Sequence, residues 1–591
     1  MGKHRKFVAI GALIALLGLM IPGYAGYPDG GQSSISPAEL QDWLGYISSD
    51  ELEGRDTFSE GLGLAAAYIT DHLREWGIHP AAENGKSYLQ TVRVLGVKSA
   101  NHSTVTVEAN GQTRTFENGA GISLPPNSGG KRTVPSDQVE FLGYGLDAPL
   151  AGHTDYKGKE VKNKIAVWLG DRGPKGLDLR TYFRALFGRS RYATEQQGAL
   201  ASIGPEISFG RRGGQRGQQQ GGGPQQQAQP ANQQQAVVQQ MFGARVPVEE
   251  PDFTTVQRLD DPIPPSVSAQ DDFFTFLFNG QEATYADLKD KAEKQEALPS
   301  FTLKNVKITI NINADYRVVK TQLTHNVVGI LEGSDPQLKD TYVAFGAHYD
   351  HVGYAQGEVV ETKDGPRRAG AVGRVTDGAI DDRIWNGADD DGSGTVTEMA
   401  IAKAFATGPK PKRSILFVWH TGEEKGLWGS RYFADYPLVP MDRIVAQINM
   451  DMVGRNNNNG ADEQNTVYLV GDDRISTELH NIIVDADAKI PSPLTLNYEM
   501  NDPNDLEQVY YRSDHYSYAS KGIPIVFLTT GLHPDYHANT DSAEKILYPK
   551  MANIGKLAYQ VGWQVANLEH APARDFKGPR VGKGSSGKLE M

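Results

Sequence analysis

The pattern of apolar and polar residues divides the chain into three kinds of segment. Residues 37–48 and 60–76 repeat apolar positions at helical spacing, with Ser36 as a candidate N-cap. From residue 326 onward, short apolar runs alternate with helical segments, which predicts an α/β fold with a mostly parallel central sheet flanked by helices. The runs expected to be strands are residues 327–331, 342–346, 415–419, 444–450, 467–470 and 523–528.

The middle of the chain has a different pattern, typical of short strands. Residues 139–145 and 164–169 are apolar runs, and residues 301–312 alternate apolar and polar positions. Residues 210–240 consist almost entirely of Gln, Gly, Arg, Ala and Pro, so they lack the apolar surface that would order them, and we expect a disordered loop.

These changes of pattern predict an interrupted α/β domain. Residues 26–95 would form its N-terminal part and residues 321–570 its main part. Residues 96–320 would be a β-rich insert, and residues 571–591 a disordered tail.

The N-terminus predicts export. Basic residues at positions 3–6 precede an uncharged apolar run at 7–21, which is shorter than the roughly 20 residues of a membrane span. We therefore expect residues 1–25 to be a signal peptide, with an uncleaved anchor as the alternative, and the mature protein to be periplasmic or secreted without a stable membrane span. The absence of cysteine excludes disulfides and thiolate ligands, and the net charge of -13 argues against nucleic acid as a partner.

Polar residues gather directly after the predicted strands. His and carboxylate residues follow four of these runs, and an acidic turn at residues 389–391 precedes a predicted helix at 395–405. Each such residue alone is more often structural, and an acidic turn alone more often caps a helix. Together, however, they would meet at the carboxyl edge of a parallel sheet, where imidazole and carboxylate groups suit zinc.

The motifs as a set resemble peptidase family M28, the zinc-dependent aminopeptidases with two co-catalytic metals. The resemblance covers residues 36–90 and 326–567, and the insert, through Gly143-Tyr144-Gly145 and residues 161–164, resembles a protease-associated (PA) domain. The strings that carry the family resemblance are His348-Tyr349-Asp350, Asp390-Asp391-Gly392-Ser393-Gly394, Glu423-Glu424, Asn449-Met450-Asp451-Met452 and Tyr536-His537.

The resemblance implies the zinc exopeptidase fold and two Zn²⁺ ions per chain. One zinc would be held by His348 and Asp451, the other by Glu424 and His537, and Asp390 would bridge both. Chemistry supports a shared carboxylate, because two neighbouring dications repel each other.

Three more carboxylates are expected to support these ligands. Asp350 would accept a hydrogen bond from the imidazole of His348, and Asp391 lies beside the bridging residue. Asp541 would accept a hydrogen bond from the imidazole of His537, or it would cap the last helix together with Glu544.

Two residues are implied in catalysis on peptides with a free N-terminus. Glu423 would be the general base that activates the metal-bridging water. Tyr536 would donate a hydrogen bond to the developing oxyanion, unless it is only a packed aromatic residue. The family also implies a cis peptide bond between Asp390 and Asp391.

Three alternatives remain open at this point. A related metallocarboxypeptidase or dipeptidase would need a cation for the substrate carboxylate, and Arg383 and Arg512 lie near the motifs. A single-zinc glutaminyl cyclase and a non-catalytic receptor-like protein share the fold.

The long connection at residues 357–385 is expected to form part of the rim above the metals.

Overall fold

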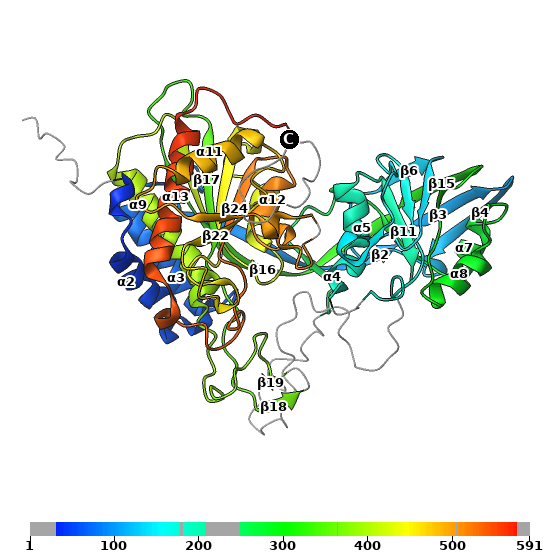
Figure 1. Ribbon diagram of the computed structural model, residues 1–591, viewed down its shortest axis with the longest axis horizontal. Coiled ribbons are helices and arrows are strands. Elements are labelled where there is room, and N and C mark those ends of the chain that lie inside the picture. Colours follow the sequence, from blue (N-terminus) through cyan, green and yellow to red (C-terminus); the bar gives the residue numbers. More distant parts are fainter. Residues whose placement is uncertain (1–30, 178–180, 207–248, 363–364, 504, 576–591) are drawn as a thin grey trace, which may run out of the picture.

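The computed structural model describes residues 31–177, 181–206, 249–362, 365–503 and 505–575. Its described part forms two lobes, each built on its own ten-stranded sheet (Figure 1). The expected signal peptide at 1–25, the Gln-rich tract at 210–240 and all but the first five residues of the expected tail at 571–591 lie outside the described residues.

The larger lobe contains the sheet predicted from the apolar runs. In spatial order its strands are β12 (Phe253–Thr255), β2 (Leu89–Asn101), β16 (Ala314–Leu331), β20 (Ser414–His420), β17 (Tyr342–His348), β21 (Ile444–Met450), β24 (Ile525–Thr529), β22 (Thr466–Val470) and β23 (Thr495–Asn497), with β1 (His79–Pro80) paired to β16.

The predicted parallel arrangement holds at the centre of this sheet. Strands β20, β17, β21 and β24 are all parallel to their neighbours within this group. On either side, β16 runs antiparallel to β20 and β22 antiparallel to β24, so the sheet as a whole is mixed. The carboxyl ends of the four central strands therefore meet at one edge.

Helices cover both faces of the larger sheet. Alternate strand residues divide between the faces: Val343 and Phe345 belong to one apolar cluster and Ala344 to another. The first cluster includes residues of α2 (Pro37–Ile47), α3 (Glu60–Glu75), α9 (Gly394–Thr407), α11 (Thr477–Asp487) and α13 (Tyr548–Asn567). The second includes residues of α10 (Trp428–Asp435) and α12 (His515–Ala519).

The helix boundaries agree with the sequence signals. The Ser36 side chain accepts a hydrogen bond from the backbone N–H of Glu39, so Ser36 caps α2 as predicted. The Ser59 side chain likewise accepts from the N–H of Leu62 at the start of α3. Both helices end within one residue of the predicted positions.

The smaller lobe is the predicted β-rich region. In spatial order its strands are β14 (Ser300–Thr302), β7 (Val139–Leu142), β10 (Ile165–Val167), β11 (Ala201–Pro205), β13 (Ser266–Ala269), β5 (Gly121–Ser123), β4 (Gln112–Asn118), β3 (Thr104–Ala109), β15 (Val306–Ile312) and β6 (Arg132–Ser136). Its helices include α4 (Phe183–Phe187), α5 (Arg189–Arg191), α7 (Asp271–Leu277) and α8 (Tyr285–Glu293). We call it the insert lobe; its assignment to the PA domains stays a prediction.

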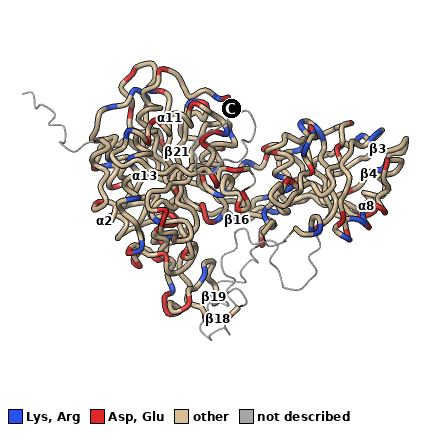
Figure 2. The backbone as a smooth tube through the Cα atoms, viewed as in Figure 1, with Lys and Arg blue, Asp and Glu red and all other residues tan. Residues whose placement is uncertain are grey.

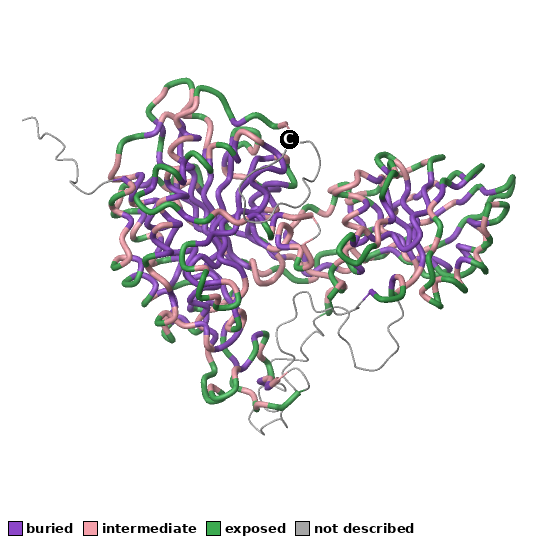
Figure 3. Tube along the Cα trace, viewed as in Figure 1, coloured by how far each residue is buried: buried purple, intermediate pink, exposed green. Residues whose placement is uncertain are grey.

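Two long strands connect the lobes. Strands β2 and β16 pair antiparallel from Leu89 opposite Val327 to Asn101 opposite Ala314, and this ribbon leads from the larger sheet toward the insert lobe (Figure 1). Each lobe has its own buried interior (Figure 3). A two-stranded hairpin, β18 (Val359–Thr362) and β19 (Gly365–Arg368), projects from the larger lobe.

Lys and Arg are interspersed with Asp and Glu along both lobes (Figure 2). Among the described residues, no helix has both the length and the apolar character needed to cross a membrane.

One buried acid in α9 gives a testable consequence for stability. Glu398 is fully buried; its Oε1 accepts a hydrogen bond from the N–H of Val418, and burial raises its pKa well above the ordinary value. The folded chain therefore holds a proton on Glu398 at pH values where the unfolded chain has lost it. This contribution to the free energy of unfolding is complete below the pKa of Glu398 in the unfolded chain. It falls by about 1.4 kcal/mol per pH unit as the pH rises from that value toward the higher pKa in the folded chain.

We predict that Glu398→Gln removes this pH dependence, because the amide oxygen keeps the hydrogen bond and carries no proton to lose. Denaturant unfolding between pH 5 and pH 8 should show the variant gaining stability relative to wild type as pH rises. A difference between the two proteins that is constant with pH would contradict this account.

Candidate metal centre

The four central strands and the turn before α9 bring the predicted site residues together. His348 ends β17, Glu423 and Glu424 follow β20, and Asp451 follows β21. His537 lies in the segment that follows β24. Because these strands are parallel, their carboxyl ends present these side chains at one edge, as the sequence predicts.

Asp390 lies between two groups of ligand-type side chains. Its Oδ1 is 3.3 Å from His348 Nε2, which is also 3.7 Å from Asp451 Oδ1. Its Oδ2 is 3.1 Å from His537 Nε2, which is also 3.1 Å from Glu424 Oε2. Each oxygen of Asp390 therefore faces a different histidine and carboxylate pair.

These distances fit ligands that share a cation. Two ligand atoms held about 2.0–2.2 Å from one zinc in tetrahedral geometry lie about 3.3–3.6 Å apart. The N···O distances among the five predicted ligands given above are 3.1–3.7 Å. His348 Nε2, Asp390 Oδ2 and Glu424 Oε1 are buried without a hydrogen-bond partner among the described residues, which is costly unless a ligand satisfies them. Imidazole and carboxylate are the donors that suit zinc.

The second group contains a histidine that was not predicted. His351 is fully buried, and its Nδ1 lies 2.8 Å from Glu424 Oε1 and 3.9 Å from Asp390 Oδ2. The contact with Glu424 has the length of a charge-assisted hydrogen bond but not its linear orientation. The signal in the sequence was the His348-Tyr349-Asp350-His351 string, in which only the first and third residues were given roles.

The histidines influence the ionisation of the acids that they contact. Burial opposes ionisation of Asp390, but the close contacts with the imidazoles of His348 and His537 hold the pKa of Asp390 well below its ordinary value. Burial likewise opposes ionisation of Glu424, while His537 and the contact with His351 hold the pKa of Glu424 at about 2. Both acids are thus available as carboxylates.

A buried arginine supports the acidic turn from behind. Arg55 donates hydrogen bonds to the carbonyl oxygens of Asn386 (2.7 Å) and Gly387 (3.0 Å), directly before the acidic residues. Burial lowers the pKa of Arg55 to about 10, and the surrounding carboxylates, including Asp350 and Asp391, oppose that shift. Sequence reasoning gave Arg55 no role, because it acts on a turn more than 300 residues away through backbone carbonyls.

Asp391 forms hydrogen bonds with backbone N–H groups, as expected of a residue that supports the candidate ligands. Its carboxylate accepts hydrogen bonds from the N–H groups of His348, Gly394 and Met452 at 2.9–3.1 Å. It therefore ties the ends of β17 and β21 to the start of α9. The peptide bond between Asp390 and Asp391 is cis, as predicted.

Two of the expected supporting contacts differ in detail. His348 Nδ1 lies 3.1 Å from the carbonyl oxygen of Asp350 and 3.7 Å from its carboxylate. The Asp350 carboxylate instead accepts from the N–H of Glu423 and the hydroxyl of Thr57. Asp350 thus positions the general-base candidate as well as the histidine.

Asp541 plays neither of the two roles considered for it. Its Oδ2 accepts hydrogen bonds from the N–H groups of Asp389 (2.9 Å) and Asp390 (3.1 Å), and Glu544 pairs with Ser542 instead. The carboxylate therefore fixes the backbone of the acidic turn. Sequence spacing indicated only local partners and could not reveal a contact with a turn about 150 residues earlier.

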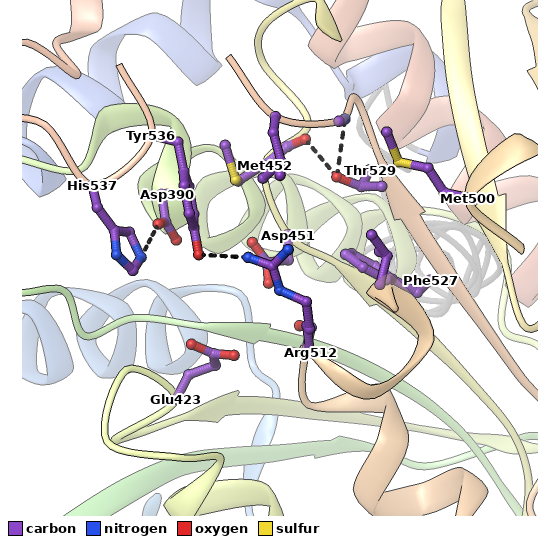
Figure 4. A pocket seen from close by; sticks show the side chains of 14 residues that line it. Asp390, Glu423, Asp451, Met452, Met500, Arg512, Phe527, Thr529, Tyr536 and His537 are labelled. Atoms are coloured by element: carbon purple, nitrogen blue, oxygen red, sulfur yellow. Dashed lines mark hydrogen bonds and ion pairs between the residues drawn. The ribbon is translucent and has the colours of Figure 1, made fainter. Parts of the chain in front are cut away.

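Glu423 faces a pocket beside the two groups (Figure 4). Burial and the neighbouring Glu424 and Asp451 raise the pKa of Glu423 well above its ordinary value, although His348 opposes the shift. The apolar part of the pocket is lined by Met452, Met500, Val509, Phe527 and Leu532.

Tyr536 and Arg512 also line this pocket and contact each other. Arg512 Nη2 donates a hydrogen bond to the Tyr536 hydroxyl at 3.2 Å (Figure 4), and the Tyr536 ring stacks on His537 with 4.0 Å between centroids. Tyr536, which directly precedes the candidate ligand His537, therefore lines the pocket beside that ligand. Arg383, the other cation considered, is not among the pocket-lining residues.

Part of the long connection after β17 lies beside the site, as predicted. Arg374 donates from its side chain to the carbonyl oxygens of Pro534 and Tyr536, and its N–H donates to the carbonyl oxygen of His537. These bonds hold the segment that carries Tyr536 and His537.

Comparisons with known proteins give matches over part of this chain. The chain is similar to a probable leucine aminopeptidase of Arthroderma benhamiae, 28% identical over 189 residues, which are 30% of this chain and 48% of the relative. It is also similar to aminopeptidase Y of Saccharomyces cerevisiae, 26% identical over 285 residues, which are 45% of each chain. The matched part of this chain thus spans about half the length of these relatives.

Among solved structures, an aminopeptidase from Aneurinibacillus sp. strain AM-1 is 17% identical, covers 93% of this chain and 99% of its own, and has a TM-score of 0.41. Residues 326–562 match the sequence model of peptidase family M28. That segment contains the four central strands and the residues grouped around Asp390. The similarity to peptidase family M28 therefore extends over residues 326–562 of this chain.

Proposed function

We propose that this protein is an exported metallo-aminopeptidase that uses two zinc ions to hydrolyse the N-terminal peptide bond of peptides. The observation that carries the proposal is the position of Asp390, whose two carboxylate oxygens face separate histidine and carboxylate pairs. His348 and Asp451 would hold one zinc, Glu424 and His537 the other, and Asp390 would serve both. The ions would polarise the scissile carbonyl and acidify water.

The side chains around the pocket have roles that follow from their positions. Glu423 takes a proton from the attacking water and passes it to the leaving amine, and its raised pKa favours proton acceptance. The Tyr536 hydroxyl donates a hydrogen bond to the oxygen that gains negative charge. The apolar wall formed by Met452, Met500 and Phe527 suits an apolar N-terminal side chain, in line with the leucine aminopeptidases among the relatives.

A carboxypeptidase or dipeptidase is the second candidate, because Arg512 offers a cation inside the pocket. Arg512 is already paired with Glu507 at 2.8 Å, which reduces its availability for a substrate carboxylate. Two peptides of equal length separate the candidates: one with a free N-terminus and an amidated C-terminus, the other N-acetylated with a free C-terminus. The aminopeptidase hydrolyses only the first, and cleavage of only the second would establish the alternative.

Substitution of the adjacent glutamates should separate catalysis from metal binding. We predict that Glu423→Gln keeps both zinc ions and loses about 10²- to 10⁴-fold in kcat, because a general base is removed. Glu424→Gln should instead lose zinc from the second group. Metal content and kcat measured on both variants test this, and equal loss of zinc from the two variants would refute the division of roles.

His351 should strengthen metal binding at the second group only. We predict that His351→Ala lowers zinc affinity there by about 10- to 100-fold, the usual cost of losing a residue that orients a ligand. The site of His348 and Asp451 should keep its affinity. Competition with a chromophoric chelator measures both constants, and His570→Ala, at an exposed histidine away from the site, is the matched control. Equal weakening of both sites would contradict this role.

A further inference from the structure

The insert lobe contacts the loop that forms one wall of the substrate pocket. We call residues 505–516 the wall loop; within it, Val509, Arg512 and Ser513 line the pocket that contains Glu423. Residues 182–196 of the insert lobe, which include α4 and α5, lie against the outer side of this loop, and we call them the docking segment.

Four interactions join the docking segment to the wall loop. Arg184 Nε lies 3.3 Å from Glu507 Oε2. Arg191 Nη2 donates to Gln508 Oε1 at 2.6 Å, and the Arg191 guanidinium lies 4.1 Å from the centroid of the Tyr511 ring. The Tyr516 hydroxyl donates to the Glu195 carboxylate. The docking segment thus holds the wall loop along most of its length.

The held part of the loop has a backbone conformation that needs support. Gln508 has φ 50° and ψ 44°, in the left-handed region that non-glycine residues seldom adopt. Such a conformation persists where the surrounding structure holds it. Arg191 supplies such support directly to the Gln508 side chain.

Glu507 connects the insert lobe to the pocket. Its Oε2 is shared by Arg184 of the docking segment and by Arg512 Nη1, at 3.3 Å and 2.8 Å. Arg512 in turn donates to the Tyr536 hydroxyl at 3.2 Å. Glu507, which pairs with Arg512 beside the pocket, is therefore held in place by Arg184 of the insert lobe.

We propose that the insert lobe positions the substrate-pocket wall, with Glu507 as the positioning residue and Arg184 and Arg191 as its anchors on the insert lobe. This inference rests on the proposed peptidase function for its kinetic consequence only. Arg184, Arg191 and Glu507 touch neither metal ligands nor Glu423, and Glu507 reaches Tyr536 only through Arg512. Their loss therefore acts first on how substrate fits the pocket and leaves Glu423 in place for the proton transfers. We therefore expect substitution of these residues to change KM more than kcat.

The experiment combines hydrogen exchange and kinetics on the full chain. The test variants are Arg184→Ala/Arg191→Ala and, independently, Glu507→Gln; Arg184→Lys keeps the ion pair and should behave as wild type. Lys289→Ala, which breaks the exposed Lys289–Asp271 pair elsewhere on the insert lobe, is the matched control. Exchange is followed by mass spectrometry in peptides covering residues 505–516, and KM and kcat are measured with a leucine amide.

The double variant and Glu507→Gln should show faster exchange in residues 505–516 and no change in β17 or β21. Their KM should rise roughly 3- to 10-fold, as expected when partly exposed ion pairs and hydrogen bonds are removed, with kcat within about twofold of wild type. Unchanged exchange in the wall loop overturns the proposal, as does faster exchange with an unchanged KM. If wild type hydrolyses no peptide, the proposed function fails, while the exchange result still decides whether the insert lobe holds the loop.

Discussion

The structure depends on keeping several carboxylates together, away from water, at one edge of a sheet. Asp390, Asp391 and Asp451 are all buried, and so is the side chain of Glu424. Like charges in a medium of low polarity repel strongly, so such a cluster persists only if each acid has its own compensation. The groups that offset the negative charge differ from one acid to the next. These differences indicate which acids support the turn and which would bind metal.

Asp391 and Asp541 are compensated by backbone N–H groups, which fixes the shape of the turn before α9. Arg55 adds a buried cation behind that turn. Asp390 and Glu424 are compensated by histidines alone and keep buried oxygens without hydrogen-bond partners among the described residues. Asp391 is thus satisfied by the chain itself, and Asp541 through its Oδ2, with Arg455 Nη1 3.9 Å from its Oδ1. Asp390 and Glu424 still need a cation.

Much of the site could be predicted because its residues follow directly after apolar runs. His348, Glu424 and Asp451 stand at or just beyond strand ends, and parallel strands deliver their ends to one edge whatever their exact order. Strand direction itself has no signature in an apolar run, which is why the antiparallel strands β16 and β22 were not anticipated. His351 and Asp541 were missed or misassigned because their partners are distant in sequence. The contact of Arg184 with Glu507 depends on the relative placement of two lobes, about which local patterns carry no information.

The central claim is that one carboxylate serves two metal positions, and zinc titration of the metal-free protein and of Asp390→Asn tests it most directly. Calorimetry should find two zinc ions per wild-type chain, with both binding steps weakened in the variant, because the two oxygens of Asp390 face different sites. Saturation of the wild type at one zinc, or a variant in which only one step is weakened, would contradict the account.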